Sequence, residues 1–197
     1  MRPKIIMHNQ ISLNASLTNF TVNMELHYQI LGSLHADAHL IGSNTAKTGL
    51  TEFLEEIPTE TSQHLKPNPI QPNDTRPYWI LIDSHAQMLN LLHIFRQFEY
   101  CKDIIVLITP NTPKDYHNYL QKRHYHTLIT GTNQINLKQA LEKLYTDYQI
   151  TTIVTDTGQT LNSHFNPGLD EGKIVTTEAH LPVLTKVTAG KLIKGTL

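Results

Sequence analysis

The residues Ile104-Ile105-Val106-Leu107-Ile108 form the longest uninterrupted aliphatic run in this chain of 197 residues. A run that is short and apolar throughout is typical of a central parallel strand, which is covered on both faces. It is far shorter than the roughly 20 residues that a membrane-spanning helix needs. The run therefore predicts a buried strand in the middle of an α/β sheet.

Short apolar runs alternate with longer segments of helical period along the whole chain. The predicted strands span residues 4–8, 38–41, 78–82, 104–108, 127–130, 151–155 and 173–177. The predicted helices span residues 24–34, 47–57, 87–98 and 158–165, and two more begin after the N-caps Thr112 and Asn136. This alternation predicts a single α/β domain over residues 1–197, with a mostly parallel central sheet flanked by helices.

The composition excludes several classes of protein. With a formal net charge of −1, the chain lacks the basic excess with which nucleic-acid-binding proteins neutralise phosphates. The single cysteine, Cys101, cannot form an internal disulfide or a zinc site built on cysteines. The twelve histidines are scattered singly, so we predict no metal site. No signal peptide or membrane span is visible, and we expect a cytoplasmic protein that acts on a small-molecule substrate.

Glycine and hydroxyl residues follow three of the predicted strands. These loops are Gly42-Ser43-Asn44-Thr45, Asp83-Ser84-His85 and Asp156-Thr157-Gly158-Gln159-Thr160. In open α/β sheets the carboxyl ends of the strands meet at the edge where ligands bind. Backbone N–H groups at helix starts, together with hydroxyl donors, bind phosphate. Ordinary turn and capping chemistry explains each loop alone, whereas the three together favour a ligand that carries phosphate.

The order of four segments resembles the dihydrofolate-reductase-like superfamily. It resembles more closely the C-terminal reductase domain of the riboflavin-biosynthesis deaminase-reductase. The four segments are Arg2-Pro3-Lys4 to Ile11-Ser12-Leu13, Ala36-Asp37-Ala38 to Gly42-Ser43-Asn44-Thr45, Arg76-Pro77 to Asp83-Ser84, and Asn136-Leu137 to Leu161. The match runs from about residue 2 to about residue 175. It implies a dihydrofolate-reductase-like three-layer fold with a mixed, mostly parallel sheet.

The resemblance also implies an activity, a cofactor and site residues. The implied activity is NADPH-dependent reduction of 5-amino-6-(5-phosphoribosylamino)uracil, or of a related pteridine or pyrimidine. The implied cofactor-binding residues are Gly42 and Thr45 at the pyrophosphate, Ser84 and His85 at the 2′-phosphate, Thr109 at the adenosine, and Gly158, Gln159, Thr160 and Leu161 on the nicotinamide side. The implied substrate-binding residues are Ser12, Leu13, Asn14 and Asp156, of which Asn14 and Asp156 are the catalytic candidates. By analogy with the family we expect a homodimer.

Three departures from the family pattern leave alternatives open. Asn14-Ala15 stands where the family has Asp-Gly, and an asparagine offers no negative charge to a cationic intermediate. Thr157 replaces the first glycine of a Glu-Gly-Gly segment. The C-terminal end after Pro182 is expected to be shortened and to lack the family's closing strands. One alternative is a non-catalytic nucleotide-binding relative of the same fold. The other is an unrelated α/β protein that binds a mononucleotide or a sugar phosphate.

Overall fold

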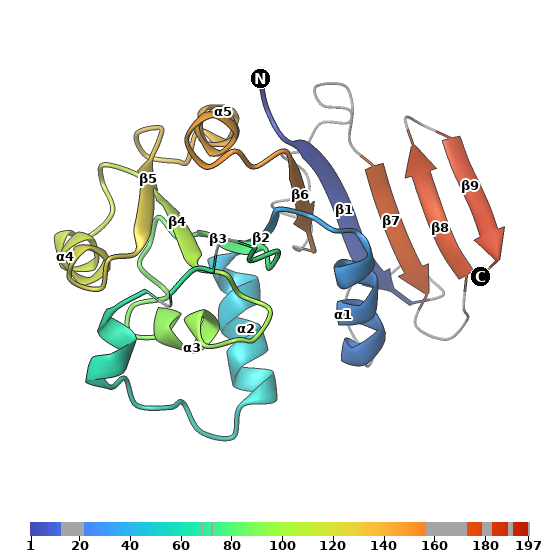
Figure 1. The fold of residues 1–197 in the computed structure, drawn as a ribbon. Helices are drawn as coiled ribbons and strands as arrows, with labels where there is room; N and C mark the ends of the chain where they lie inside the picture. Colours follow the sequence, from blue (N-terminus) through green and yellow to red (C-terminus); the bar gives the residue numbers. More distant parts are fainter. Residues whose placement is uncertain are drawn as a thin grey trace. The chain divides into compact units, whose positions relative to one another are not determined.

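The computed structural model describes residues 1–12, 22–67, 69–71, 73–156, 173–178, 183–188 and 191–196. The chain divides into two compact units. Unit 1 consists of Met1–Pro3 and Asp37–Ile150, and unit 2 consists of Lys4–Ala36 and Thr151–Leu197. Figure 1 shows the helices and strands of both units along the chain. The assignment of residues 1–197 to a single domain stays a prediction.

Unit 1 is built on parallel strands that lie in the order β5-β4-β3-β2. The strands are β2 (Ala38–Gly42), β3 (Tyr78–Ile82), β4 (Ile104–Ile108) and β5 (His126–Ile129). Every residue of β4 is buried, and the strand pairs with β3 on one side and β5 on the other. The apolar run that predicted a central parallel strand is therefore confirmed.

Helices cover both faces of these strands. They are α2 (Ser43–Phe53), α3 (Leu92–Arg96), α4 (Lys114–Lys122), α5 (Leu137–Tyr148) and the 3-10 helix η1 (Ser62–Leu65). Figure 1 shows α5 on the opposite side of the strands from α2 and α3. One apolar core includes Leu50 of α2, Phe95 of α3 and Tyr116 of α4, packed against β2, β3 and β4. In the described residues, no helix is long and apolar enough to cross a membrane.

The helix predicted over residues 87–98 is much shorter in the structure, where α3 spans Leu92–Arg96. Two interactions explain the difference. The buried Asp83 carboxylate accepts hydrogen bonds from the backbone N–H groups of Gln87 and Met88, both at 2.9 Å. The backbone then takes a left-handed conformation at Asn90, whose φ is 62°. All five residues of α3 are buried.

Two other helix starts differ from the sequence prediction. Helix α2 begins at Ser43, four positions before the predicted Lys47. Helix α4 begins at Lys114 with Pro113 as its N-cap, and no side chain caps it. The hydroxyl of the predicted cap Thr112 instead accepts the N–H of Thr109 and donates to the carbonyl of Ser84. The Asn136 cap is confirmed, because its side chain accepts the N–H of Gln139 at 3.0 Å.

Unit 2 combines parallel and antiparallel strands with one described helix, α1 (Met24–Ser33). Strand β1 (Lys4–Ile11) lies between β6 (Thr152–Thr155) and β7 (Lys173–Glu178), and all three are parallel. Strands β8 (Val183–Thr188) and β9 (Lys191–Thr196) continue this sheet in antiparallel pairing. The expected absence of closing strands is therefore wrong. A strand in an antiparallel sheet can have polar residues on one face, so these segments lack a continuous apolar run.

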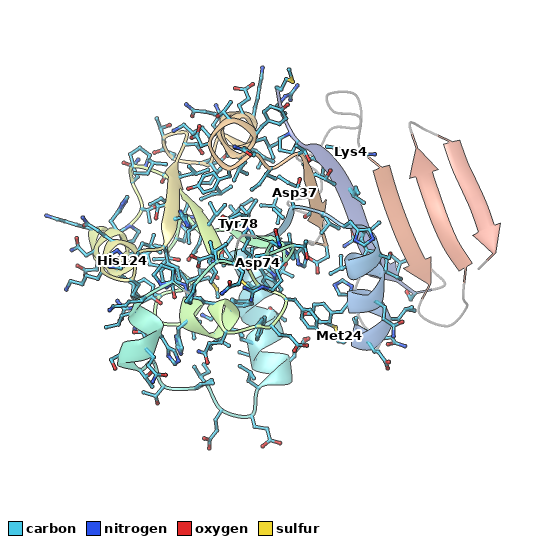
Figure 2. The ribbon with its side chains drawn as sticks, in the orientation of Figure 1. Lys4, Met24, Asp37, Asp74, Tyr78 and His124 are labelled. Carbon is cyan, nitrogen blue, oxygen red and sulfur yellow. The ribbon has the colours of Figure 1, made fainter. Side chains whose placement is uncertain are left out.

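The loop before β3 is closed by an ion pair. Arg76 donates to both carboxylate oxygens of Asp74, at 2.9 and 2.6 Å. Asp74 lies close before Tyr78, the first residue of β3 (Figure 2). The hydrogen bonds from Arg76 lower the pKa of Asp74 to about 2. Lys102 lies with its Nζ 5.0 Å from the centre of the Tyr78 ring. These contacts fix the chain where β3 begins, at the amino ends of the strands.

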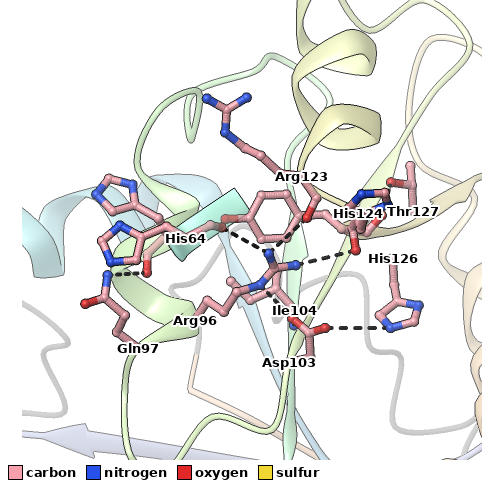
Figure 3. A network of polar contacts seen from close by, with 11 residues as sticks. His64, Arg96, Gln97, Asp103, Ile104, Arg123, His124, His126 and Thr127 are labelled. Atoms are coloured by element: carbon pink, nitrogen blue, oxygen red, sulfur yellow. Dashed lines mark hydrogen bonds and ion pairs between the residues drawn. The ribbon is translucent and has the colours of Figure 1, made fainter. Parts of the chain in front are cut away.

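A buried ion pair ties α3 to the amino end of β4 (Figure 3). Arg96 Nε lies 2.9 Å from Asp103 Oδ1, and the two side chains are 2% and 0% exposed. The same Asp103 oxygen accepts the N–H of Ile104 at 2.8 Å. The Arg96 guanidinium also donates to the Arg123 carbonyl at 3.0 Å and stacks on the Tyr125 ring at 3.8 Å. Both charges are therefore compensated within unit 1.

We expect Asp103→Asn to destabilise the protein strongly. The substitution leaves the buried Arg96 guanidinium without its counter-charge, which should lower the free energy of unfolding by about 3 kcal/mol. Urea denaturation followed by circular dichroism measures this loss. Asp147→Asn is the control, because Asp147 is exposed and its substitution should cost less than about 0.5 kcal/mol. Equal losses in the two variants would contradict a structural role for the pair.

Candidate functional site

The carboxyl ends of β2, β3 and β4 meet at one edge of unit 1. The register pairs Gly42 with Ile82, and Ile82 with Leu107, so the three strands end at neighbouring positions. The Asp83 N–H continues this alignment by donating to the Leu107 carbonyl at 3.0 Å. The residues that follow the three strands therefore share one edge, as their parallel direction requires.

The first part of this edge is the N-terminus of α2. Gly42 is the N-cap, and no side chain there satisfies the first backbone N–H groups of the helix. Among the residues that the structure describes, none comes within 4 Å of a β-carbon added at Gly42, so they leave the space beside this helix end open. The first turn has no acidic residue, and Thr45 is exposed. Open N–H groups beside a hydroxyl side chain are the donor set that a phosphate requires, so the residues present fit a nucleotide diphosphate.

The second part of the edge is the loop after β3. Asp83 is completely buried, and its two carboxylate oxygens accept the Gln87 and Met88 N–H groups. Ser84 is half-buried and His85 is exposed. Because the backbone around them is fixed by Asp83, these two side chains are presented at a defined place on the edge. A hydroxyl and an imidazole there suit a second anionic group.

Thr109 and Thr112 support that loop from the end of β4. The Thr112 hydroxyl accepts the Thr109 N–H at 3.0 Å and donates to the Ser84 carbonyl at 3.1 Å. The two hydroxyl oxygens lie 3.3 Å apart. Thr109 is 1% exposed, so it borders the edge mainly through its backbone. Thr112 was predicted to cap a helix, so its role in supporting this loop was not expected from the sequence.

A separate polar group lies in unit 2, beside the carboxyl end of β6. We call His8, His27 and Asp156 the His27 cluster. His27 Nε2 lies 3.0 Å from Asp156 Oδ2, and the rings of His8 and His27 are 4.9 Å apart between centroids. The Asn9 side-chain amide donates to the Asp156 carbonyl at 3.1 Å. The predicted catalytic residue Asp156 thus contacts His27, which in turn packs against His8, and neither histidine was predicted from the sequence.

The sequence did contain a signal for these histidines. His27 lies four and seven positions before Leu31 and Leu34, so it shares their helical stripe. His8 lies two positions from both Ile6 and Gln10 in β1, so the three residues share one face of the strand. A histidine at a position where the pattern expects an apolar residue is a candidate for a buried polar role.

The predicted site residues fall into three groups. The cofactor-binding candidates Gly42, Thr45, Ser84, His85 and Thr109 lie at the edge of unit 1. The candidates Ser12 and Asp156 belong to unit 2, where they follow the parallel strands β1 and β6. Six candidates lie outside the described residues: Leu13, Asn14, Gly158, Gln159, Thr160 and Leu161. The binding and catalytic roles of all these residues stay predictions.

The described part of the chain contains few other groups with reactive chemistry. No cluster of His, Cys, Asp or Glu side chains there could hold a metal ion. Cys101 is buried, and this burial raises the pKa of its thiol to about 12. A thiol with so high a pKa is not a nucleophile near neutral pH. The polar edge of unit 1 and the His27 cluster are therefore the features with functional chemistry.

Comparison with solved structures finds this fold in reductases of riboflavin biosynthesis. RibD of Acinetobacter baumannii is 18% identical, with a TM-score of 0.56; the match covers 91% of this chain and 47% of RibD. The riboflavin biosynthesis reductase Rib7 of Saccharomyces cerevisiae is 17% identical, with a TM-score of 0.56; the match covers 93% of this chain and 82% of Rib7. A pyrimidine reductase-like protein of Corynebacterium diphtheriae is also 17% identical, with a TM-score of 0.56; the match covers 90% of this chain and 74% of that protein.

These similarities establish the fold. The chain spans about half the length of RibD, and at such identities the likeness concerns architecture alone. No family model and no curated protein matches the sequence. The predicted α/β fold of the riboflavin-biosynthesis reductases, with its mostly parallel mixed sheet flanked by helices, is confirmed. The alternative of a different α/β architecture is therefore wrong, whereas binding of a mononucleotide or a sugar phosphate stays a prediction.

We expect Asp83→Asn to loosen the loop that presents Ser84 and His85. The new NH₂ group cannot accept a hydrogen bond, so one buried backbone N–H of residues 87–88 loses its partner. The free energy of unfolding should fall by about 1–3 kcal/mol, and hydrogen exchange at Gln87 and Met88 should speed up. Asp115→Asn is the control, because Asp115 is exposed in the first turn of α4. Unchanged exchange at residues 87–88 would contradict this role for Asp83.

Proposed function

We propose that this protein is an NADPH-dependent reductase of the riboflavin-biosynthesis type. The substrate class is 5-amino-6-(5-phosphoribosylamino)uracil or a related pyrimidine or pteridine. One observation carries the proposal: a phosphate-compatible edge at β2 and β3, with an open helix N-terminus, occurs on the fold that riboflavin-biosynthesis reductases share. The RibD and Rib7 similarities support the fold, and the donor groups of unit 1 support the cofactor.

In this proposal unit 1 binds the phosphates of NADPH. The N-terminus of α2, with Gly42 and Thr45, binds the diphosphate through backbone N–H groups and a hydroxyl. Ser84 and His85 bind the 2′-phosphate, which distinguishes NADPH from NADH. The end of β4 at Thr109 borders the adenosine. When bound, NADPH supplies the hydride.

Few side chains are needed for the reaction itself, because hydride transfer depends chiefly on orientation and on exclusion of water. The ribosylamine, NADPH and one proton give the ribitylamine and NADP⁺, so atoms and charges balance. The C1′–O bond of the ribose ring would break as the ring oxygen takes up the proton, which leaves a cationic iminium. Hydride would then add to C1′ while the C=N π electrons move to nitrogen. A carboxylate near that cation stabilises it, and Asp156 is the carboxylate assigned to this task.

A non-catalytic nucleotide-binding protein of the same fold is the second candidate. Asn14 and Thr157 favour it, because both differ from residues that the catalytic family uses. The two candidates share cofactor binding and differ in turnover. Oxidation of NADPH in the presence of the ribosylaminopyrimidine, followed at 340 nm, separates them; binding without oxidation would favour the second.

We expect His85→Ala to weaken NADPH binding about tenfold, a loss of about 1.4 kcal/mol, while NADH binding stays unchanged. The reason is that only NADPH carries the phosphate that His85 contacts in this proposal. Isothermal titration calorimetry with both cofactors measures the difference. His117→Ala, on α4, is the matched control and should change neither affinity. Failure of the wild-type protein to bind NADPH at millimolar concentration would contradict the proposed function.

We expect Gly42→Asp to lower the affinity for NADPH and NADH alike, by about tenfold or more. Its carboxylate would stand at the helix end that receives the diphosphate. Because a side chain at Gly42 meets none of the described residues within 4 Å, the thermal midpoint should stay close to that of the wild type. Gly42→Ala adds a similar β-carbon without charge and should bind both cofactors more tightly than Gly42→Asp. Equal affinities of the two variants would show that no diphosphate binds there.

A further inference from the structure

Helix α1 buries a histidine where its pattern calls for an apolar residue. Leu31 and Leu34, on the same stripe, pack against Ile6 and Val154. His27 is the one buried residue of α1, a helix that the structure describes throughout. A large aliphatic side chain buried at this position would contribute about 1.5–3 kcal/mol. Packing alone therefore does not account for an imidazole here.

The His27 ring contacts Asp156 and His8. Its Nε2 lies 3.0 Å from Asp156 Oδ2, and Nε2 donates to this oxygen in the tautomer that carries the ring proton on Nε2. The His8 ring lies against it at a centroid distance of 4.9 Å. The His27 side chain is 8% exposed and that of Asp156 is 16% exposed. Asp156 is thus the more accessible member of the pair, and His27 supports it from the interior.

Both partners of this hydrogen bond are attached to fixed backbone. The N-terminus of α1 is held to β1 by Gln10, whose amide donates to the Asn23 carbonyl at 2.8 Å and accepts the Asn23 N–H at 3.0 Å. The Asp156 carbonyl is held by Asn9 of β1. The carboxylate is therefore oriented by contacts from two elements of unit 2, α1 and β1.

We propose that His27 is a positioning residue, whose Nε2–H orients the Asp156 carboxylate toward the cationic iminium of the substrate. This inference rests on the proposed reductase function. The sequence has Asn14 where the family has an aspartate, so the negative charge must come from another residue. A hydrogen bond from Nε2–H leaves the Asp156 carboxylate as the acidic group that a cationic intermediate requires. Orientation matters because misplacement by about 1 Å can cost 100-fold in rate.

The test compares His27→Leu, His27→Gln and Asp156→Asn with the wild-type chain. At saturating NADPH, His27→Leu should lower kcat roughly 10- to 100-fold without lowering the thermal midpoint. His27→Gln retains an amide N–H donor and should recover much of the lost kcat. The double variant His27→Leu with Asp156→Asn should be no slower than Asp156→Asn alone, because the two residues act as one unit. Leu31→Ala is the control, and it should lower the thermal midpoint while leaving kcat unchanged.

A second readout does not depend on turnover. Long-range ¹⁵N NMR of the histidine rings should show the Nε2–H tautomer for His27 in the wild type, and a shift toward Nδ1–H in Asp156→Ala. A wild-type His27 in the Nδ1–H tautomer, or a His27→Leu variant as fast as the wild type, would overturn this inference and leave the proposed function standing. A wild-type protein that never oxidises NADPH would instead overturn the proposed function, and this inference with it.

Discussion

The alignment of parallel strands around β4 is the constraint on which the rest of unit 1 depends. All five residues of β4 are buried, and each buried aliphatic side chain contributes about 1.5–3 kcal/mol. Such a strand must have helices on both of its faces. The connections between parallel strands then pass through those helices, so every strand of this group ends at the same edge.

Buried carboxylates at the two ends of the unit 1 strands have different kinds of partner. At the amino ends, Asp103 and Arg96 satisfy each other in the interior. At the carboxyl ends, Asp83 is equally buried, but its partners are backbone N–H groups of its own loop. Buried charges at the first edge fix the fold, whereas Asp83 fixes a loop whose Ser84 and His85 remain accessible. The accessible donors therefore lie at the edge where open α/β sheets bind ligands.

Much of the fold could be predicted because buried parallel strands leave continuous apolar runs, as in residues 78–82 and 104–108. The short α3 could not, since the Asp83 carboxylate bonds to residues 87–88 and replaces the first helical turns. Strands β8 and β9 could not, because an antiparallel strand can carry polar residues on one face.

The candidate site was predictable only in part. The edge residues of unit 1 follow their strands directly, so their positions could be deduced from the strand ends. The contact of His27 with Asp156 joins residues 129 positions apart, and no local spacing reveals such a pair. A single histidine in an apolar stripe is a signal that needs the structure to supply its partner.

A crystal structure of the 197-residue chain grown with NADPH would show whether the carboxyl edge of β2 and β3 binds the phosphates of a pyridine nucleotide. We expect density for the diphosphate at the N-terminus of α2 and for the 2′-phosphate beside Ser84 and His85. Cofactor density at another surface, with this edge empty, would contradict it.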